Sequence, residues 1–192
     1  MNGAEQLFTH IRVIIGVVLG LGLTHVLRHL AHIVEHPRLA RTWWVHLIWA
    51  FSTFLYLVHF WWWEFHLNTI SHWNFTAYLF VILYAVLLYL LCALLFPEDL
   101  SGYDGFRDYF LSRRQWFFGV LAIAYLLDFV DTWMKGTAHL HALGAEYIVR
   151  GVVFVVLCLV AMRTRNERFH GAFAVLGLIY QLSFILRLYY VE

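Results

Sequence analysis

The sequence predicts an all-α integral membrane protein, a polytopic bundle of six transmembrane helices. Of its 192 residues, 62% are hydrophobic and 13% are charged, whereas soluble domains carry about 25% charged residues. The apolar residues gather in six blocks, each close to the ~20 residues that a helix needs to cross a bilayer. Because lipid offers no hydrogen-bond partner to the backbone, every block is expected to be helical. The blocks are Leu7 to Val26, Trp43 to Trp63, Phe75 to Phe96, Trp116 to Trp133, Tyr147 to Met162 and Phe173 to Tyr189.

The individual blocks have features that fit membrane spans. The first lacks the positive region and the cleavage site of a signal peptide, so we expect a retained span. The second and fourth end at Trp63 and Trp133, and tryptophan is favoured at the membrane surface. The third and fifth contain Cys92 and Cys158, which we expect to be small lipid-facing or packing residues without a disulfide. The sixth carries Arg187, which is expected to face the bundle interior.

Arginines are concentrated in every second connection between the blocks. The second connection has neither Lys nor Arg, and the fourth has only Lys135. Short loops rich in Lys and Arg stay on the cytoplasmic side. We therefore expect connections one, three and five to be cytoplasmic and both termini to lie outside, in a bacterial-type plasma (inner) membrane. The basic residues of these three connections are Arg38, Arg41, Arg107, Arg113, Arg114, Arg163, Arg165 and Arg168.

The chain is expected to form a single membrane domain, residues 1–192. Its longest connection, Pro97 to Arg114, is predicted to be an ordered cytoplasmic loop between halves 1–97 and 115–192. Two three-span halves would lie in opposite orientations, as in the inverted repeats of many transporters. Gly16-Val17-Val18 matches Gly119-Val120-Leu121, which fits a 3+3 inverted repeat. Short apolar matches also arise by chance, so both interpretations stay open.

Four histidines follow one another at helical spacing from the end of the first block onward. At about 100° per residue they form a stripe about 60° wide on one helix face. Imidazoles one turn apart can share a divalent metal ion, a proton or an anionic head group. They can equally be interfacial side chains that bind nothing. The four are His25, His29, His32 and His36, and Gly16 and Gly20 form a GxxxG on the opposite face, for internal packing or a homo-oligomer.

His46 and His59 on the second span lie about 20 Å apart along a helix axis, one near each leaflet. This spacing resembles the two-tier histidines of membrane b-type cytochromes such as the ferric reductases and the cytochrome b561 proteins. The resemblance implies haem b as cofactor and electron transfer as function. It also implies a partner histidine for each on another helix, for which His10 and either His25 or His29 are the candidates.

Five ionisable residues are expected in the outer third of the membrane. Intramembrane charges are costly, so they face the bundle interior and find partners. We expect the five to meet, as a cavity that binds a cation or proton or as an ion-pair network that only fixes helix register. They are Asp128, Asp131, Glu146, Arg150 and Arg187.

The spacing of these residues also suggests which of them pair. Glu146 and Arg150 are four positions apart, the spacing of an intrahelical pair. Arg187 is then expected to pair with Asp128 or Asp131, and one carboxylate is left without a basic partner. From the first half of the chain, the residues that could join them are Arg12, His59 and Glu64.

The outer connections add four histidines, which suit either weak metal capture at the mouth of such a cavity or simple solvation. They are His66, His72, His139 and His141.

These observations narrow the function classes. A net charge of +1 without a basic patch argues against nucleic-acid binding, and the expected partner is the lipid bilayer. No nucleotide loop, nucleophile elbow or zinc-protease helix is present, so an enzyme is not favoured. The first hypothesis is a small transporter or channel for protons, a divalent metal ion or a small polar solute. The alternatives are a haem b electron-transfer protein and a non-catalytic, lipid-interacting membrane subunit with structural ion pairs.

Overall fold

The structure is a computed structural model that describes residues 3–36, 41–70 and 73–190. These residues form six α-helices and one short 3-10 helix, η1, with no strand among them. All six α-helices are long and apolar enough to cross a membrane, which confirms the six-span integral membrane fold. The helices are α1 (Gly3–Glu35), α2 (Trp44–Trp63), η1 (Glu64–Thr69), α3 (Phe75–Leu95), α4 (Phe106–Met134), α5 (Thr137–Arg163) and α6 (Glu167–Tyr190).

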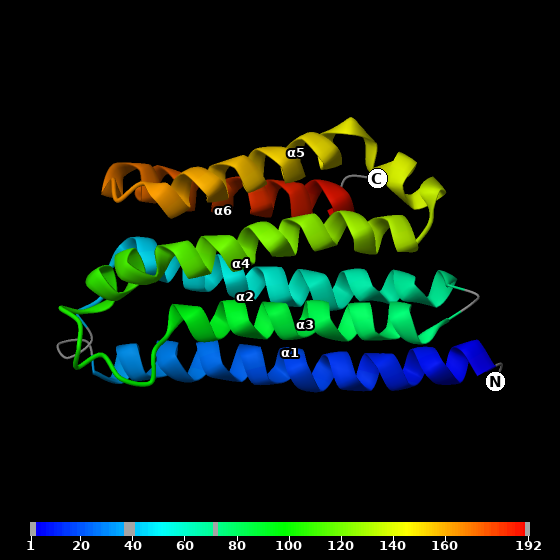
Figure 1. The fold of residues 1–192 in the computed structure, drawn as a ribbon, viewed down its shortest axis with the longest axis horizontal. Helices are drawn as coiled ribbons and strands as arrows, with labels where there is room; N and C mark the ends of the chain where they lie inside the picture. Colours follow the sequence, from blue (N-terminus) through cyan, green and yellow to red (C-terminus); the bar gives the residue numbers. More distant parts are fainter. Residues whose placement is uncertain (1–2, 37–40, 71–72, 191–192) are drawn as a thin grey trace.

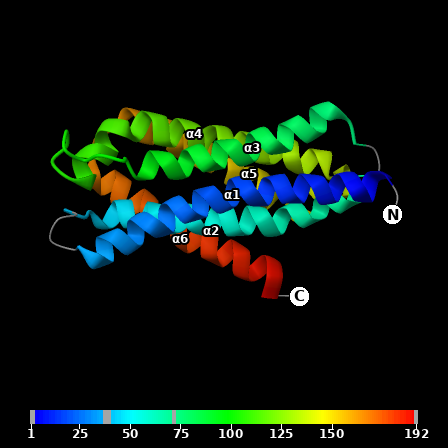
Figure 2. The ribbon, with the colours of Figure 1, turned by 90° about the horizontal axis from the view of Figure 1, so that it is seen from below.

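The six α-helices lie along the long axis of the molecule and alternate in direction (Figure 1; Figure 2). Both chain termini therefore lie at one end, here called the terminal end. The C-terminal ends of α1, α3 and α5 and the N-terminal ends of α2, α4 and α6 lie at the opposite end, here called the arginine end. The basic connections thus gather on one side of the bundle, as alternating spans require.

Helix α2 occupies the centre of the bundle and contacts α1, α3, α4 and α6. The closest helix pairs are α1 with α3 and α4 with α5. In the first half of the chain α1 thus packs along α3, the third helix of that half. In the second half α4 packs along α5, the second helix of that half. The two halves differ in neighbour order, and the 3+3 inverted repeat stays a prediction.

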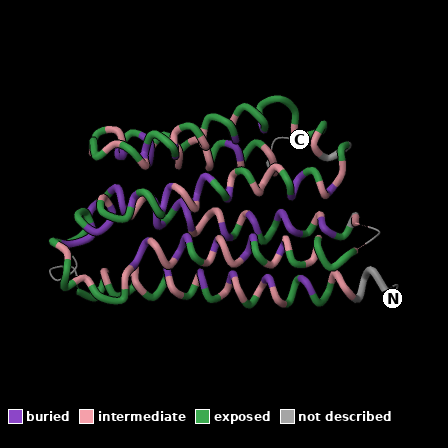
Figure 3. Tube along the Cα trace, in the orientation of Figure 1, coloured by how far each residue is buried: buried purple, intermediate pink, exposed green. Residues whose placement is uncertain are grey.

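Buried residues concentrate on α2, α3 and α4, whereas α5 is largely exposed (Figure 3). In the core, Tyr84 and Phe118 have no exposed surface. The exposed residues of the outer helices are themselves apolar, which is the surface a lipid-facing helix presents. On α5 and α6 they include Val152, Val153, Val156, Leu159, Leu176, Ile179 and Leu186.

A cluster of aromatic rings fills the bundle centre in the half nearer the arginine end. The Trp49 ring lies 5.5, 5.3 and 5.0 Å from the rings of Phe117, Phe118 and Phe173, edge to face in each case. Such pairs are favourable beyond the apolar area they bury. We call these four residues the aromatic plug.

Several helix ends differ from the predicted blocks. Helix α1 runs to Glu35, beyond the apolar block that ends at Val26, as the helical spacing of the first-helix histidines predicted, whereas α4 begins at Phe106, ahead of the block that starts at Trp116. The predicted loop from Pro97 to Arg114 is therefore partly helix. Hydropathy detects only the part of a helix that contacts hydrocarbon, whereas a helix continues into the polar interface. Helix α5 begins at Thr137, ahead of Tyr147, and kinks at Gly144, where φ is 70°.

The two glycines of the predicted GxxxG face behave differently. A Cβ on Gly16 would lie 2.8 Å from the Trp61 ring, so this glycine lets α2 approach α1. A Cβ on Gly20 would meet nothing within 4 Å. The prediction of a tight packing face thus holds at Gly16 alone. Cys92 and Cys158 are free, as predicted, and both are buried.

Candidate functional site

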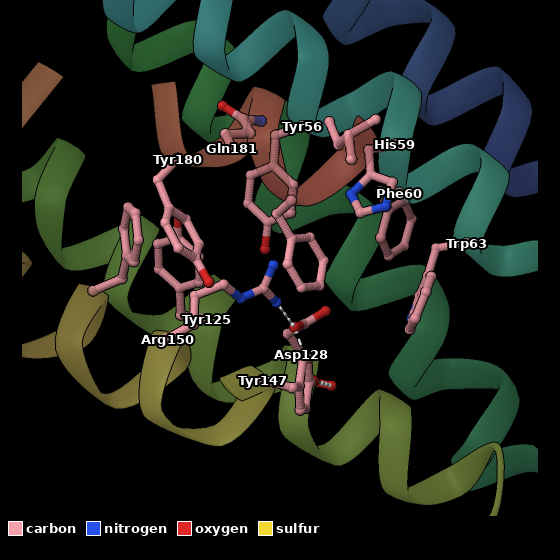
Figure 4. Close-up of a pocket in the computed structure, with 13 residues that line it drawn as sticks. Tyr56, His59, Phe60, Trp63, Tyr125, Asp128, Tyr147, Arg150, Tyr180 and Gln181 are labelled. Carbon is pink, nitrogen blue, oxygen red and sulfur yellow. Dashed lines mark hydrogen bonds and ion pairs between the residues drawn. The ribbon is translucent and has the colours of Figure 1, made fainter. Parts of the chain in front are cut away.

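Asp128 and Arg150 form an ion pair between α4 and α5 near the terminal end (Figure 4). The Arg150 guanidinium donates to an Asp128 carboxylate oxygen at 3.4 Å. It also lies over the rings of Phe184 and Tyr147, 4.2 and 5.1 Å from their centroids, which favours a cation. The Tyr147 hydroxyl lies 2.9 Å from the same Asp128 oxygen and donates to it. Because the single hydroxyl proton of Tyr147 is donated to Asp128, the Tyr147 oxygen accepts the hydrogen bond from the Thr132 hydroxyl, at 2.8 Å.

This ion pair lines a small cavity between α2, α4, α5 and α6 (Figure 4). Its volume is about 50 Å³, enough for a few water molecules or one small ion. Most of the wall is aromatic, and the polar atoms come from a few side chains. The lining includes Tyr56, His59, Phe60, Trp63, Tyr125, Asp128, Tyr147, Arg150, Tyr180 and Gln181.

A second hollow of about 20 Å³ adjoins this cavity on the side of the arginine end. Tyr56, Tyr125 and Gln181 line both. The Tyr56 and Tyr84 hydroxyls hydrogen-bond to each other at 3.0 Å. The Gln181 amide donates to the Ser52 carbonyl at 3.1 Å. Trp49, a member of the aromatic plug, is the α2 residue of this lining that lies nearest the arginine end.

A second ionic group lies beside the cavity and is fully buried. Lys135 donates from Nζ to Glu64 Oε1 at 2.8 Å and to Asp131 Oδ2 at 2.5 Å. The three side chains are at most 2% exposed. The remaining oxygens, Glu64 Oε2 and Asp131 Oδ1, have no hydrogen-bond partner among the described residues. We call these three residues the buried triad.

The buried triad holds two carboxyl groups and one ammonium. Burial disfavours the charged ammonium, but the two neighbouring carboxylates outweigh it and raise the pKa of Lys135. Lys135 therefore stays charged at neutral pH, and the two acids exceed it by one negative charge unless a proton or a cation neutralises it. An uncompensated charge in such a place costs several kcal/mol.

Trp63 connects the buried triad to the cavity. It lines the cavity wall, and its ring lies 5.6 Å from the Lys135 ammonium. Glu64 is its neighbour in the sequence, at the start of η1. Asp131 follows Asp128 by three residues on α4 and so lies one turn along the helix. The triad and the cavity are thus adjacent parts of one polar region at the terminal end.

The other predicted site residues, Glu146 and Arg187, form a separate pair. Arg187 donates to Glu146 Oε1 at 2.5 Å and to Oε2 at 2.9 Å, between α5 and α6. Tyr180 adds a 2.7 Å hydrogen bond to Glu146. Both partners are about half exposed and neither lines the cavity. The five charged residues therefore do not form one cluster.

The predicted ion-pair partners are wrong. Arg150 bonds to Asp128 and not to Glu146, although the latter lies four positions before it. Arg187 bonds to Glu146 and not to Asp128. The spacing of four allows contact within a helix, but Arg150 faces the bundle interior, where a carboxylate of α4 is closer. Three residues from the first half of the chain were expected to join the charged residues. His59 lines the cavity and Glu64 belongs to the buried triad. Arg12 instead lies over the rings of Phe8, Trp61 and Phe65.

The first-helix histidines lie at the arginine end, far from this region. His25 Nε2 is 3.2 Å from the Phe96 carbonyl, and the His29 ring stacks on Phe96 at 5.0 Å. His32 and His36 are exposed and 4.8 Å apart between ring centroids. The stripe therefore splits into two environments.

The haem b alternative does not fit this arrangement. His46 is fully buried, its Nε2 bonds to the Leu95 carbonyl at 2.7 Å, and its ring stacks on Phe106. Phe96 contacts the His46 ring as well as the His25 and His29 rings, so it fills the place a porphyrin would need. His59 bonds to the Tyr189 hydroxyl at 3.1 Å beside a cavity of about 50 Å³, which is far too small for haem.

The outer histidines show no common site in the part of the chain that is described. His66 is half-buried and contacts the Trp63 ring, and His141 is exposed. His72 and the side chain of His139 lie outside the described residues. Metal capture by this group stays a prediction.

Two residues of this region had little signal in the sequence. Lys135, noted above only as the basic residue of the fourth connection, is at the centre of the buried triad. Its position four residues after Asp131, on the same helix face, could have indicated the pair. Tyr147, the tyrosine that binds Asp128, had no sequence signal beyond lying three positions before Arg150.

Fold and site together define a class: a six-span helical membrane protein with a small, buried ionic region near one end of the bundle. No family model, curated protein or solved structure matches the chain.

Proposed function

We propose that the protein is a small proton carrier or channel whose proton-binding groups are the buried triad and Asp128. The observation that carries this is the composition of the triad, two buried carboxyl groups around one ammonium. Two carboxyl groups beside one ammonium leave one negative charge that a bound proton would neutralise. The oxygens Glu64 Oε2 and Asp131 Oδ1, which have no hydrogen-bond partner among the described residues, offer the place for that proton.

The size of the cavity supports protons over larger cargo. About 50 Å³ accommodates a few water molecules, which can pass a proton to Asp128, but it leaves little room for an organic solute. A divalent ion would have to lose most of its hydration shell to enter. Arg150 beside Asp128 would also repel it.

The aromatic plug supports a carrier-like mechanism. Polar groups reach from the terminal end down to Ser52 and Gln181, and the rings around Trp49 close the way beyond. A proton bound at the terminal end can reach the arginine end only if these rings move. Binding on one side and release on the other would then alternate, as in carriers generally.

The arginines support an orientation in which the arginine end faces the cytoplasm and the cavity faces outward, in a bacterial-type inner membrane. Single cysteines at Ser101 and His141, which lie at opposite ends, would test it in intact cells or spheroplasts. Labelling by an impermeant maleimide at position 141 alone is the expected result. Labelling at position 101 alone would reverse the orientation.

Proton flux into proteoliposomes tests the function. The vesicles contain a pH-sensitive dye, and a potassium gradient with valinomycin sets the membrane potential. Wild-type protein should acidify the lumen faster than empty vesicles do. Glu64→Gln and Asp128→Asn should abolish the difference, whereas Glu146→Gln, which changes an exposed carboxylate outside the cavity, should retain it.

Two results would contradict the proposal. Wild-type flux equal to that of empty vesicles would favour a non-catalytic membrane subunit whose ion pairs are structural. Equal flux in wild type, Glu64→Gln and Asp128→Asn would show transport that does not use this site.

A further inference from the structure

The four histidines of α1 include two that are already engaged and two that are free to bind a ligand. His29 donates from Nδ1 to the His25 carbonyl at 2.8 Å, and His25 Nε2 lies at the Phe96 carbonyl. Both rings pack against Phe96. His32 and His36 lie further along the same face and are exposed. Within the stripe, the histidines that can bind a ligand are therefore His32 and His36, the pair at the end of α1.

Glu35 forms a group of three potential metal ligands with His32 and His36. One ligand atom from each of His32, Glu35 and His36 lies within 4.8 Å of the other two. Positions i, i+3 and i+4 place the three side chains on one face of the helix end. Donors around a tetrahedral Zn²⁺ are about 3.3 Å apart, given metal–ligand bonds of about 2.0 Å. Small rotations of three exposed side chains would bring them to that distance.

We propose that His32, Glu35 and His36 bind a divalent transition-metal ion, with Zn²⁺ as the best fit. Two imidazole nitrogens and one carboxylate suit Zn²⁺ and its late transition-metal neighbours. Mg²⁺ and Ca²⁺ prefer sites made of oxygen ligands and are disfavoured here. Three protein ligands leave a fourth coordination position for water or an incoming group.

The surroundings of the three ligands attract cations. His32 and Glu35 line an open groove of about 760 Å³ between the end of α1 and residues 97–100. Glu98 and Asp99 lie on the groove wall, with Arg28 as the basic residue. The Ser101 hydroxyl and backbone N–H both donate to Asp99, which lowers the pKa of this carboxyl and keeps it charged. The groove is therefore net negative.

Metal binding here is independent of proton transport through the cavity at the terminal end. Helix α1 ends at the arginine end, whereas α4 ends at the terminal end (Figure 1), and Asp128, which binds Arg150, lies in the last two turns of α4. Loss of one activity would leave the other intact.

Zn²⁺ titration of the purified protein tests the site. The protein carries an affinity tag without histidine, and a chromogenic chelator competes for the metal. Wild type should bind one Zn²⁺ per chain at the described site, undisturbed by millimolar Mg²⁺ or Ca²⁺. The double variant His32→Ala/His36→Ala should lose this binding, and Glu35→Gln should weaken it roughly tenfold or more. The matched control is His141→Ala, an exposed histidine at the terminal end, which should bind as wild type does.

Co²⁺ provides a second readout, because its visible absorption reports nitrogen and oxygen ligands in a site of low coordination number. That absorption should appear in wild type and be absent from the double variant. Unchanged thermal unfolding of the double variant would show that it is folded, as expected for two exposed side chains. The proposal is overturned if wild type binds no Zn²⁺, if the folded double variant still binds it with wild-type affinity, or if His141→Ala removes it.

Discussion

Glu64 and Lys135 are 71 positions apart in the sequence, yet the Lys135 ammonium donates to the Glu64 carboxylate at 2.8 Å with both side chains buried. The contact joins the end of α2 to the end of α4, and Asp131 completes it from the last turn of α4. Three charged groups thus share a place that neither water nor lipid reaches. The stability and the proposed activity of the protein both depend on how their charges balance.

Removal of Lys135 should destabilise the protein strongly. Lys135→Met leaves two buried carboxyl groups without their counter-charge, and breaking a buried pair in this way costs about 3–5 kcal/mol. Thermal unfolding in detergent should show a clear loss of Tm. The matched variant Arg187→Met breaks a half-exposed pair and should leave Tm nearly unchanged. Equal effects of the two variants would mean that the triad is not buried as described.

The pH dependence of stability should carry the signature of Lys135. Burial opposes its charge, but the two carboxylates outweigh burial and raise its pKa in the folded protein. The stabilisation is therefore complete below the ordinary lysine pKa, about 10.4, and is lost as pH rises through the raised value. Between pH 8 and 12 the Tm of wild type should fall more steeply than that of Lys135→Met. Parallel curves would contradict the raised pKa.

Tyr147→Phe should weaken the Asp128 site while the fold persists. The change removes a hydrogen bond to a buried carboxylate and leaves the Thr132 hydroxyl without its acceptor. A loss of about 1.5–3 kcal/mol in unfolding free energy is expected, together with slower proton flux in vesicles. Tyr89→Phe, on α3 and outside the cavity lining, is the control. Wild-type flux and stability in Tyr147→Phe would remove the tyrosine from the site.

Gly16→Leu should disturb the contact between α1 and α2, whereas Gly20→Leu should not. A Cβ at position 16 already approaches the Trp61 ring to 2.8 Å, so a larger side chain must displace it at a cost of about 1–3 kcal/mol. Position 20 has free space around it. Thermal unfolding of both variants measures the difference. Loss of an oligomer in Gly20→Leu alone, seen by size-exclusion chromatography with light scattering, would instead assign that face to a second copy of the chain.

Prediction from sequence succeeded where a property depends on consecutive residues. The hydropathy of six blocks indicated the six helices, and the arginines of alternate connections indicated one basic end. The free state of Cys92 and Cys158 also follows from their isolation in the chain. The start of α4 at Phe106 was not predicted, because hydropathy does not follow a helix beyond the hydrocarbon core.

The candidate site was predicted only in part, for a physical reason. Asp128 and Arg150 were singled out because ionisable residues are costly within a span, and both line the cavity. The choice of partner was wrong, because the distance between charges on different helices depends on which faces pack together. The role of Lys135 depends on η1 bringing Glu64 against the end of α4, a contact that no local pattern encodes.

The sequence by itself determined that this chain crosses the membrane six times and which of its residues are polar within the spans. Each of these properties is a local balance between a side chain and lipid, so it can be judged residue by residue. Only the tertiary structure decided that Glu64, Asp131 and Lys135 share one buried place, that Arg150 binds Asp128, and that Phe96 fills the space beside His46. Those contacts act over a few ångströms between helices that are distant in the chain, and their packing alone sets which groups come that close.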